Sequence, residues 1–576
     1  MSEQTRQIDT YIGEDGNPTA HVTMSPTSNL MRCHVEAPPD RAIPIVFLPG
    51  IMGSPLIATG NSARLIGDEN VWAWFPDDSL GWVAGITKWS SYSSLSPAQR
   101  KRLLNPHETR PLEVTDQAHR KTVEKAVQSS IPVEEAFRRG WGTVLLDSYG
   151  EILKFLETRL SNIITPRGEP SSGTAGRAIP SRALPWGEYQ GTYTPLDKQA
   201  FQAAAEFRYP VFAVGYNWLR SNEDAAEYLY DRTQAILSYC KKDLRLTCNH
   251  GVILLTHSMG GLVARRFAQQ HPEMVQGIVH SVQPSVGAAT AYRRVRAGWE
   301  DFKGAVGLGD NGKKIMPIFA NAAGPLELLP TQSYGTGWLR AQSNSGEPIF
   351  QLPLVNPYDE IYLETRAWWR LMDPLWVDPV DTDAPPGTPR PSIARGWENY
   401  SSNIELARKF HGELGNYYHP NTYVTYGGDD GKKAFSTVTW RFSQNTISSA
   451  IPGRAATAGP MLSKAHALDL HLKFDNYKGR VTMINSQSEK AMINQYGAGV
   501  VHDTLNDAHM ADLQDADQAG DSTVPLNSAK HAADNARFAV KMKGYGHQDS
   551  FKDERVKEVT LYALLRIGST AQKLSF

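Results

Sequence analysis

Short runs of apolar residues recur along the chain, separated by longer stretches of mixed polarity. The runs are made of aliphatic, aromatic and β-branched residues, and each is followed by Gly, Pro or a polar residue. They lie at residues 43–48, 210–216, 251–255, 277–282, 422–426 and 537–542. Because such runs are typical of strands buried on both faces, we predict a strand at each of them.

Helical patterns follow two of these runs. Residues 221–240 open with a Ser-Asn-Glu-Asp sequence, which supplies a capping side chain and an acidic first turn. Residues 261–268 carry apolar side chains at helical spacing. The alternation predicts an α/β fold whose mostly parallel central sheet has helices on both faces. Two stretches rich in Pro, Gly and Ser, at 163–200 and 377–396, are expected to be irregular.

Composition removes several functional classes. The chain has 576 residues, with 59 Lys and Arg against 60 Asp and Glu, so its formal net charge is −1. A protein that binds nucleic acid in general needs a basic excess, and we therefore expect no nucleic-acid partner. A hydrophobic fraction of 41% is enough for a large core and excludes a chain that is disordered as a whole.

Cysteine content and the N-terminal sequence bear on the compartment. Cys33, Cys240 and Cys248 are too few for a disulfide scaffold and lack metal-ligand spacing, which favours synthesis under reducing conditions. Residues 1–22 are polar, without the apolar segment of a Sec signal peptide, and no apolar run reaches the roughly 18 residues of a spanning helix. We expect a protein made in the cytoplasm; secretion by a non-Sec route into a target cell stays open.

A Thr-His-Ser-Met-Gly sequence at residues 256–260 joins a predicted strand to a predicted helix. A strand, a sharp turn with a serine and a helix form the nucleophile elbow of α/β-hydrolases, where small residues let the turn close. Thr256 replaces the first glycine of the usual pattern, whereas Gly260 is kept. We predict Ser258 as a nucleophile; the alternative is an ordinary turn that contains a serine. His257 is expected to pack or to contact substrate rather than to act as the base.

A glycine-flanked loop, Leu-Pro-Gly-Ile-Met-Gly-Ser at residues 48–54, follows the first predicted strand. An oxyanion hole needs one backbone N–H from the residue after the nucleophile and one from a loop beside it. Met259 follows Ser258, and Met52 lies where flanking glycines let an amide approach closely. We predict these two amides as the donors, with a plain turn as the alternative for the loop.

An acid and a histidine complete a set in the chain order Ser, Asp, His. Asp521 lies in a Gly-Asp-Ser-Thr-Val-Pro sequence, and His547 lies in a glycine-containing loop after the last predicted strand. A serine hydroxyl is a weak nucleophile, so a base must take its proton and a carboxylate must orient that base. We predict His547 as the base and Asp521 as the acid. Asp429, Asp430 and Asp549 remain alternatives for the acid, and His547 could be a loop residue without this role.

Together these motifs resemble the lecithin:cholesterol acyltransferase-like and PGAP1-like branch of the α/β-hydrolases. The resemblance rests on the loops at 48–54, 256–261, 520–525 and His547, and on a Tyr-Asn-Trp-Leu-Arg sequence at 216–220. A chain of this type without a signal peptide also resembles bacterial lipase effectors delivered by type VI secretion. The resemblance implies an α/β-hydrolase fold, chemistry on acyl esters of lipids, and an immunity protein or a secretion-apparatus carrier as partner.

The spacing of the candidate residues indicates large insertions. Ser258 and Asp521 lie 263 positions apart, far more than a minimal core of this fold needs. We predict an N-terminal arm over 1–40 and an α/β-hydrolase domain over 41–576. Cap insertions are expected at about 55–140, 288–415 and 431–519.

Tryptophans gather in two of these insertions. They are Trp72, Trp74, Trp82 and Trp89 in the first, and Trp368, Trp369 and Trp376 in the second. A lid over a lipid site uses such side chains to contact a bilayer or an acyl chain. The alternative is that they form the core of the cap.

Residues 501–521 carry six aspartates and two histidines. Oxygen-rich segments can bind Ca²⁺, but this one lacks the EF-hand spacing with its terminal glutamate. We expect a solvated acidic loop, no metal and no cofactor, with a Ca²⁺ site as the alternative.

The motifs therefore predict a serine hydrolase. The resemblance implies that it cleaves acyl esters of lipids, most simply of phospholipids at a membrane surface, and that it acts as an antibacterial secreted effector. His547 deprotonates Ser258, which attacks the ester carbonyl. The amides of Met52 and Met259 hold the oxyanion. Two alternatives stay open: an acyltransferase of the same fold, and a catalytically silent hydrolase fold that serves as a binding module.

Overall fold

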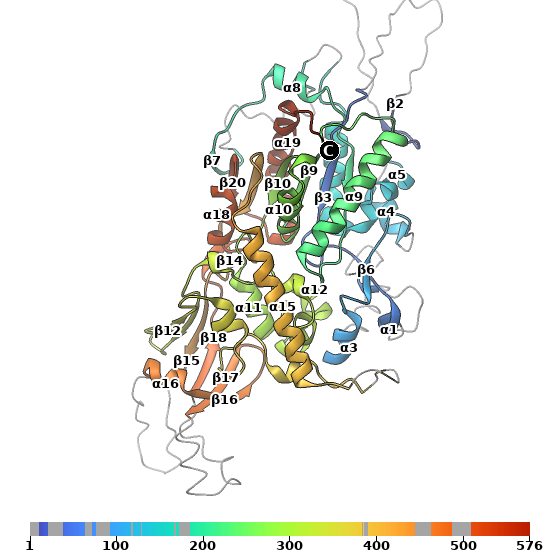
Figure 1. Ribbon diagram of the computed structural model, residues 1–576. Helices are drawn as coiled ribbons and strands as arrows, with labels where there is room; N and C mark the ends of the chain where they lie inside the picture. The colour runs from blue at the N-terminus through green and yellow to red at the C-terminus, as the bar shows by residue number, and fades with distance from the viewer. Residues whose placement is uncertain are drawn as a thin grey trace, which may run out of the picture.

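A seven-stranded sheet in the order β7-β20-β13-β10-β9-β3-β8 forms the centre of the molecule (Figure 1). Its strands are β3 (Ile45–Leu48), β7 (Glu188–Gly191), β8 (Val211–Ala213), β9 (Val252–His257), β10 (Val275–Ser281), β13 (Thr422–Gly427) and β20 (Phe538–Met542). All neighbours are parallel except β7, which is antiparallel to β20. The computed structural model describes residues 11–20, 39–63, 72–75, 93–116, 119–127, 130–165, 169–171, 185–382, 384, 387, 390–443, 462–485 and 509–575.

All six strands predicted from the apolar runs are present, and their side chains are buried on both faces. In β3, Ile45 and Phe47 pack into one core cluster, whereas Val46 and Leu48 pack into another on the opposite face. This alternation is the two-residue period of a strand that is covered on both sides. The predicted α/β class, with a mostly parallel sheet between helices, is confirmed.

Helices cover both faces of this sheet (Figure 1). The first face packs against α6 (Leu146–Leu160), α8 (Lys198–Ala204) and α19 (Glu554–Ser569). The second face packs against α9 (Asn222–Lys242), α10 (Gly260–Gln270) and α18 (Leu526–Asp534). Within the described part of the chain, no helix has both the length and the apolar character needed to cross a membrane.

Residues 288–415 and 431–519 share a second, six-stranded sheet in the order β12-β11-β15-β18-β17-β16. Its strands are β11 (Leu339–Gln342), β12 (Pro348–Leu352), β15 (Val438–Phe442), β16 (Leu470–Asp475), β17 (Arg480–Asn485) and β18 (His509–Leu513). The two segments join where β11 runs parallel to β15, with Leu339 opposite Val438. The sequence analysis did not predict this sheet, which lies below the central sheet in Figure 1.

Helices of the same region pack around this sheet and between it and the hydrolase core. They are α11 (Ala289–Ala297), α12 (Phe302–Gly307), α13 (Gly312–Phe319), α14 (Ala323–Leu326), α15 (Ile393–Leu414) and α16 (Lys464–Leu468). The prediction of irregular structure was wrong in part, because β7 lies within 163–200 and α15 begins within 377–396. The β7 sequence, Glu-Tyr-Gln-Gly, has no apolar run because this short edge strand is largely exposed.

The long segment between β13 and Asp521 begins with β14 (Asp429–Ala434) and ends with β19 (Gln518–Gly520). These two strands pair antiparallel to each other at the point where the segment joins the hydrolase core. Asp429 lies opposite Gly520, so the two ends of a long insertion are held side by side. Asp521 therefore lies beside the carboxyl end of β13, as if it followed that strand directly. A Cβ at Gly427 would come 2.7 Å from Cβ of Asp521, so only glycine permits this approach.

The described residues between 55 and 140 include a three-stranded sheet, β5-β4-β6, and several helices. The elements are β4 (Leu56–Ala58), β5 (Trp72–Trp74), β6 (Thr109–Pro111), α1 (Gly60–Ala63), α3 (Pro97–Leu103), α4 (Arg120–Val127) and α5 (Val133–Arg138). Trp74 and Trp368 are buried, and Trp368 packs edge-on against Trp440. For Trp368 the core alternative holds, whereas Trp74 also lines the cavity beside Ser258; Trp82 and Trp89 lie outside the described residues.

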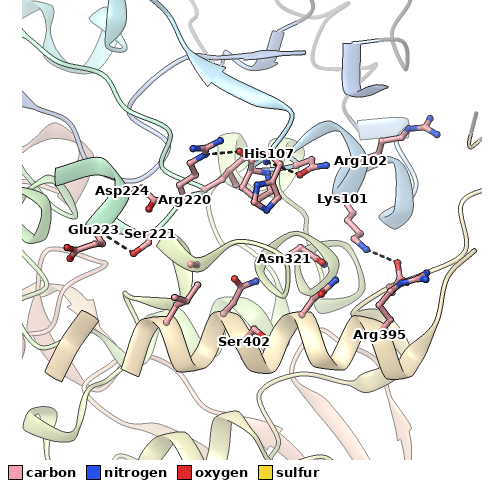
Figure 2. A pocket seen from close by; sticks show the side chains of 18 of the residues that line it. Lys101, Arg102, His107, Arg220, Ser221, Glu223, Asp224, Asn321, Arg395 and Ser402 are labelled. Carbon is pink, nitrogen blue, oxygen red and sulfur yellow. Dashed lines mark hydrogen bonds and ion pairs between the residues drawn. The ribbon is translucent and has the colours of Figure 1, made fainter. Parts of the chain in front are cut away.

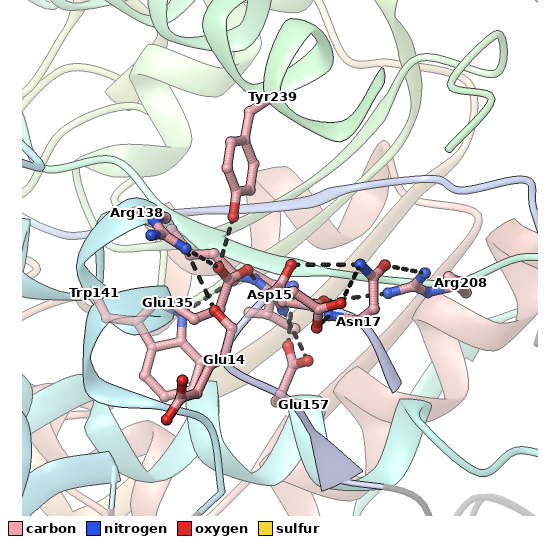
Figure 3. Close-up of polar contacts among 12 residues, drawn as sticks. Glu14, Asp15, Asn17, Glu135, Arg138, Trp141, Glu157, Arg208 and Tyr239 are labelled. Atoms are coloured by element: carbon pink, nitrogen blue, oxygen red, sulfur yellow. Dashed lines mark hydrogen bonds and ion pairs between the residues drawn. The ribbon is translucent and has the colours of Figure 1, made fainter. Parts of the chain in front are cut away.

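Arg139 lies at the centre of a buried charge network beside the edge strand β8, where Glu157 accepts from the N–H of Val211. Figure 3 shows the two glutamates of this network, Glu135 and Glu157. The Arg139 guanidinium donates to Glu135 at 2.6 Å and to Glu157 at 2.8 Å. A hairpin of β1 (Tyr11–Ile12) and β2 (Pro18–Thr19) covers the network, and the carbonyl of Gly16 accepts a further bond from Arg139 at 3.2 Å. This part of the predicted arm is thereby attached to α5.

A second buried carboxyl, Glu327, joins α14 to the beginning of α9. It accepts from the backbone N–H of Asn222 at 2.7 Å and from the Ser221 hydroxyl at 2.5 Å. An N–H that the helix itself leaves without an acceptor is thus satisfied by a remote side chain. Burial raises the pKa of Glu327 to about 8.

Replacing Arg139 by Ala leaves two buried carboxylates without their cation. We expect the free energy of unfolding to fall by about 3–5 kcal/mol. Arg138→Ala is the matched control, since this neighbouring side chain is 53% exposed and its removal should cost less than about 1 kcal/mol. Chemical denaturation at pH 7 measures both, and equal losses would contradict the role given to Arg139.

Glu327 should make stability depend on pH. Its pKa is higher in the folded protein than the ordinary 4.5, so its stabilisation is complete below about pH 4.5 and is lost as the pH rises through about 8. Glu327→Gln carries no titrating group at this position. As the pH is raised across this range, the melting temperature of the wild type should fall relative to that of Glu327→Gln. A constant difference between the two curves would show that the Glu327 carboxyl does not titrate in this way.

Candidate active site

Ser258 lies between β9 and α10 in a strained backbone conformation. Its φ is +52°, in the left-handed region that non-glycine residues rarely adopt and that costs about 1–3 kcal/mol. Its N–H donates to the carbonyl of Ser281 on the neighbouring strand at 2.9 Å, which helps to hold the turn. The hydroxyl is thereby presented at the carboxyl edge of the sheet, in the geometry of a nucleophile elbow.

Two glycines let the loop after β3 pack against this turn. A Cβ at Gly50 would lie 2.8 Å from Nδ1 of His257 and 2.8 Å from Cβ of Ser258. A Cβ at Gly260 would lie 2.6 Å from the carbonyl oxygen of Pro49. Both contacts are closer than real Cβ atoms make, so the glycines are required for the approach of the loop to the elbow.

The structure brings Ser258, His547 and Asp521 into one hydrogen-bonded chain. Nε2 of His547 lies 2.8 Å from the Ser258 hydroxyl, and Nδ1 lies 2.9 Å from Oδ2 of Asp521. His547 opens a 3₁₀ turn (His547–Lys552) that follows β20. Asp521 is 1% exposed, and its other carboxylate oxygen accepts from the N–H groups of Thr523 and Val524 at 3.0 and 2.7 Å. A second bond, from the His547 N–H to the Asp521 carbonyl, fixes the two loops together at 2.7 Å.

The three alternative acids bond elsewhere. Asp429 accepts from the N–H groups of Gly431 and Gly544, and Asp430 pairs with Lys543. Asp549 pairs with Lys552 on the surface. Among the described carboxylates, that of Asp521 is the one bonded to the imidazole of His547.

Met259 directly follows Ser258, and Met52 lines the same cavity as Ser258. Met259 caps the beginning of α10, and Met52 has a φ of +64° in the loop after β3. Neither backbone N–H has a hydrogen-bond acceptor within the described part of the chain. The indole of Trp74 donates to the carbonyl of Met52 at 2.7 Å and so helps to fix that peptide. Free N–H groups at a helix beginning can stabilise a developing anion.

A cavity of about 790 Å³ opens beside Ser258 and His547. Its apolar lining comprises Ile51, Met52, Trp74, Leu145, Pro284, Ala288, Ala291, Trp299, Phe319, Pro325, Leu328, Phe435, Ala516 and Val524. Each predicted insertion contributes to it, with Trp74 from the first, Phe319 from the second and Phe435 from the third. The volume and the apolar lining suit an acyl group next to the reactive hydroxyl.

A second cavity, of about 830 Å³, has a different chemistry (Figure 2). It lies among α3, the beginning of α9 and α15, and charged side chains line it. Lys101 pairs with Asp378 at 2.6 Å, and Arg102 pairs with Asp381 at 2.7 Å. None of the predicted site residues lines this cavity, and its charged walls do not suit an acyl chain.

Some aspartates of the acidic segment 501–521 form contacts with other side chains of the same chain. Asp512 pairs with Arg480, and Asp517 accepts from both Ser436 and Thr437. Residues 501–508 lie outside the described part. In the remainder that the structure describes, no three His, Cys, Asp or Glu side chains are grouped to hold a metal ion.

Sequence reasoning missed Tyr149, whose hydroxyl lies behind the elbow. It accepts from the N–H of Gly50 at 3.3 Å and lies 3.2 Å from Nδ1 of His257. No local motif marks this residue, because it lies within the ordinary amphipathic sequence of α6. His257 itself is buried and bonds to Tyr149 and to the His547 backbone, not to the Ser258 hydroxyl.

Comparisons with known proteins agree with this geometry. Residues 198–295, which include Ser258, match a family model described as a PGAP1-like alpha/beta domain. A chain in the crystal structure of the Tle4-Tli4 complex is similar over 92% of this chain and 99% of that chain, with a TM-score of 0.71 and 27% identity. No curated protein matches the sequence. The fold is that of an α/β-hydrolase, and the resemblance seen in the motifs is confirmed; both support an esterase or lipase in broad terms.

Gly50→Ala tests the close approach of the loop to the elbow. The new methyl must displace Ser258 or His257, so we expect ester turnover to fall by about 100-fold and the free energy of unfolding to fall by about 1–3 kcal/mol. Gly546→Ala is the control, because its Cβ would meet nothing within 4 Å although it adjoins His547. Hydrolysis of a small soluble ester measures turnover. Wild-type rates in Gly50→Ala would contradict the proposed packing.

Proposed function

We propose that this chain is a lipolytic serine hydrolase that cleaves acyl esters of lipids, most simply of phospholipids, through an acyl-enzyme on Ser258. The observation that carries the proposal is the hydrogen-bonded chain from Asp521 through His547 to Ser258 at an apolar cavity. A hydroxyl within 2.8 Å of an imidazole nitrogen can be deprotonated as it attacks.

The mechanism follows from the donors and acceptors. As Oγ of Ser258 bonds to the ester carbonyl carbon, its proton passes to Nε2 of His547. The buried carboxylate of Asp521 stabilises the imidazolium, while the N–H groups of Met52 and Met259 receive the oxyanion. The bond to the leaving alcohol then breaks, and the alcohol takes the proton from His547. Water repeats the sequence on the acyl-enzyme, releases the fatty acid and restores Ser258.

The lining of the cavity supports a lipid acyl group as substrate. Apolar side chains from the core and from all three insertions surround the space beside Ser258. Transfer of an acyl chain from water into such a space is favourable in proportion to the apolar area that is buried. The same lining also carries charged side chains of both signs, among them Lys433, Glu300 and Asp301, so the cavity has a polar part beside its apolar one.

We propose that the protein acts as a secreted antibacterial effector and that an immunity protein binds it. The likeness to a chain of the Tle4-Tli4 complex supports this role, because that crystal contains two proteins bound to each other. Synthesis in the cytoplasm and delivery by a non-Sec route belong to the same proposal.

Release of fatty acid from phospholipid liposomes tests the function. Ser258→Ala should lower the rate by at least about 1,000-fold, because the nucleophile is lost, and should leave the melting temperature nearly unchanged. Ser522→Ala, at another serine of the same cavity, is the control and should keep most of the activity. A chelator should not change the wild-type rate.

Three results would contradict the proposal in different ways. Activity retained in Ser258→Ala would remove Ser258 as the nucleophile. Cleavage of soluble esters that depends on Ser258, without release of fatty acid from liposomes, would show that the substrate is not a membrane phospholipid. Appearance of an acylated alcohol in place of free fatty acid would indicate an acyltransferase.

A further inference from the structure

A buried chain of hydrogen bonds runs behind Ser258, separate from the bonds that link it to His547 and Asp521. The N–H of Gly50 lies 3.3 Å from the hydroxyl of Tyr149, and that hydroxyl lies 3.2 Å from Nδ1 of His257. On the other side of the ring, Nε2 of His257 lies 3.0 Å from the carbonyl oxygen of His547. Tyr149 and His257 are each 1% exposed.

The direction of every bond in this chain is determined. A carbonyl oxygen only accepts, so Nε2 of His257 must carry a proton. Burial, with the nearby His547 as a smaller cause, lowers the pKa of His257 to about 3, so the ring is neutral and Nδ1 has no proton. Tyr149 must therefore donate to Nδ1, and its oxygen is free to accept from the N–H of Gly50.

These bonds join three separate parts of the site. Gly50 belongs to the loop after β3, Tyr149 to α6, and His547 to the loop after β20. A further contact reinforces the junction, because Gln548 donates to the hydroxyl of Ser148 at 2.8 Å.

We infer that His257 is a positioning residue: it fixes the His547 backbone through Nε2–H and is itself held in that tautomer by Tyr149. The inference deepens the proposed function and rests on it. His257 touches neither the Ser258 hydroxyl nor the imidazole of His547 by a hydrogen bond, so it acts through the placement of the base.

The backbone of His547 needs this contact. Its N–H donates to the carbonyl of Asp521 at 2.7 Å, and its own carbonyl accepts from His257, so the peptides on both sides of the residue are fixed. A Cβ at Gly546, the residue before it, would meet nothing within 4 Å, so no neighbouring group packs against the chain in that direction. Without His257, the carbonyl of His547 loses its partner and the residue is held through Asp521 alone, so the imidazole is less closely fixed relative to Ser258.

A neutral His257 also suits the charge that appears during turnover. The two imidazole rings lie with their centroids 5.0 Å apart. When His547 becomes an imidazolium, a second positive ring at that distance would oppose it. Burial keeps His257 uncharged and prevents this repulsion.

Two substitutions of similar polarity separate positioning from packing. His257→Gln has an amide N–H that can reach the His547 carbonyl. His257→Asn is shorter, and its amide can accept from Tyr149 but cannot reach that carbonyl. Tyr149→Phe removes the group that sets the tautomer and leaves the His257–His547 bond in place.

The experiment measures the rate at which a fluorophosphonate labels Ser258, with kcat and KM for a soluble ester and the melting temperature of each protein. We expect labelling and kcat to fall by about 10–100-fold in His257→Asn, and by less than about fivefold in His257→Gln, with KM little changed in both. The labelling rate and kcat of Tyr149→Phe should lie between those of the two His257 variants. If His257→Asn does not fold, Tyr149→Phe is measured in its place.

The outcomes separate this inference from the proposed function. Equal labelling rates in the Gln and Asn variants, or a wild-type rate in Tyr149→Phe, would overturn the positioning role while the labelled wild type still supports the hydrolase. A folded wild type that is not labelled at Ser258 would overturn the proposed function and this inference with it.

Discussion

The close approach of the loop after β3 to the turn at Ser258 is the constraint on which the rest of the site depends. The turn is held at a positive φ, and there is room for it only because Gly50 and Gly260 lack side chains. Once the turn is fixed, the Ser258 hydroxyl is held at the edge of the sheet, with Met259 after it at the beginning of α10 and Met52 on the lining of the same cavity. The free energy stored in the strained turn is offset by the packing of the parallel sheet around it.

The large insertions do not disturb the edge of the central sheet that carries Ser258, because short strand pairs hold them together where they join the core and one another. The β14–β19 pair closes the segment before Asp521, and the parallel pairing of β11 with β15 joins two insertions into one sheet. The hydrolase core can therefore carry a second sheet without displacing the acid from the base. The same insertions supply apolar side chains to the cavity, so the elements that enlarge the protein also define the space for a substrate.

Much of the core and of the candidate site could be predicted because the signals are local. Ser258 and His547 each follow a buried strand, and their neighbours identify the turns. Asp521 was harder, because its place beside β13 depends on a ladder between residues far apart in sequence. The second sheet was not predicted, because its strands are partly exposed and carry no continuous buried apolar run. Tyr149 was missed because only tertiary packing brings α6 to the elbow.

The central claim is that Ser258, activated by His547, forms the covalent intermediate. Peptide mass spectrometry of the folded protein after reaction with a fluorophosphonate that carries a long alkyl chain tests it most directly. We expect a single adduct, on Ser258, and no adduct at that residue in His547→Gln. An adduct on another residue, or equal modification of Ser258 without the histidine, would contradict it.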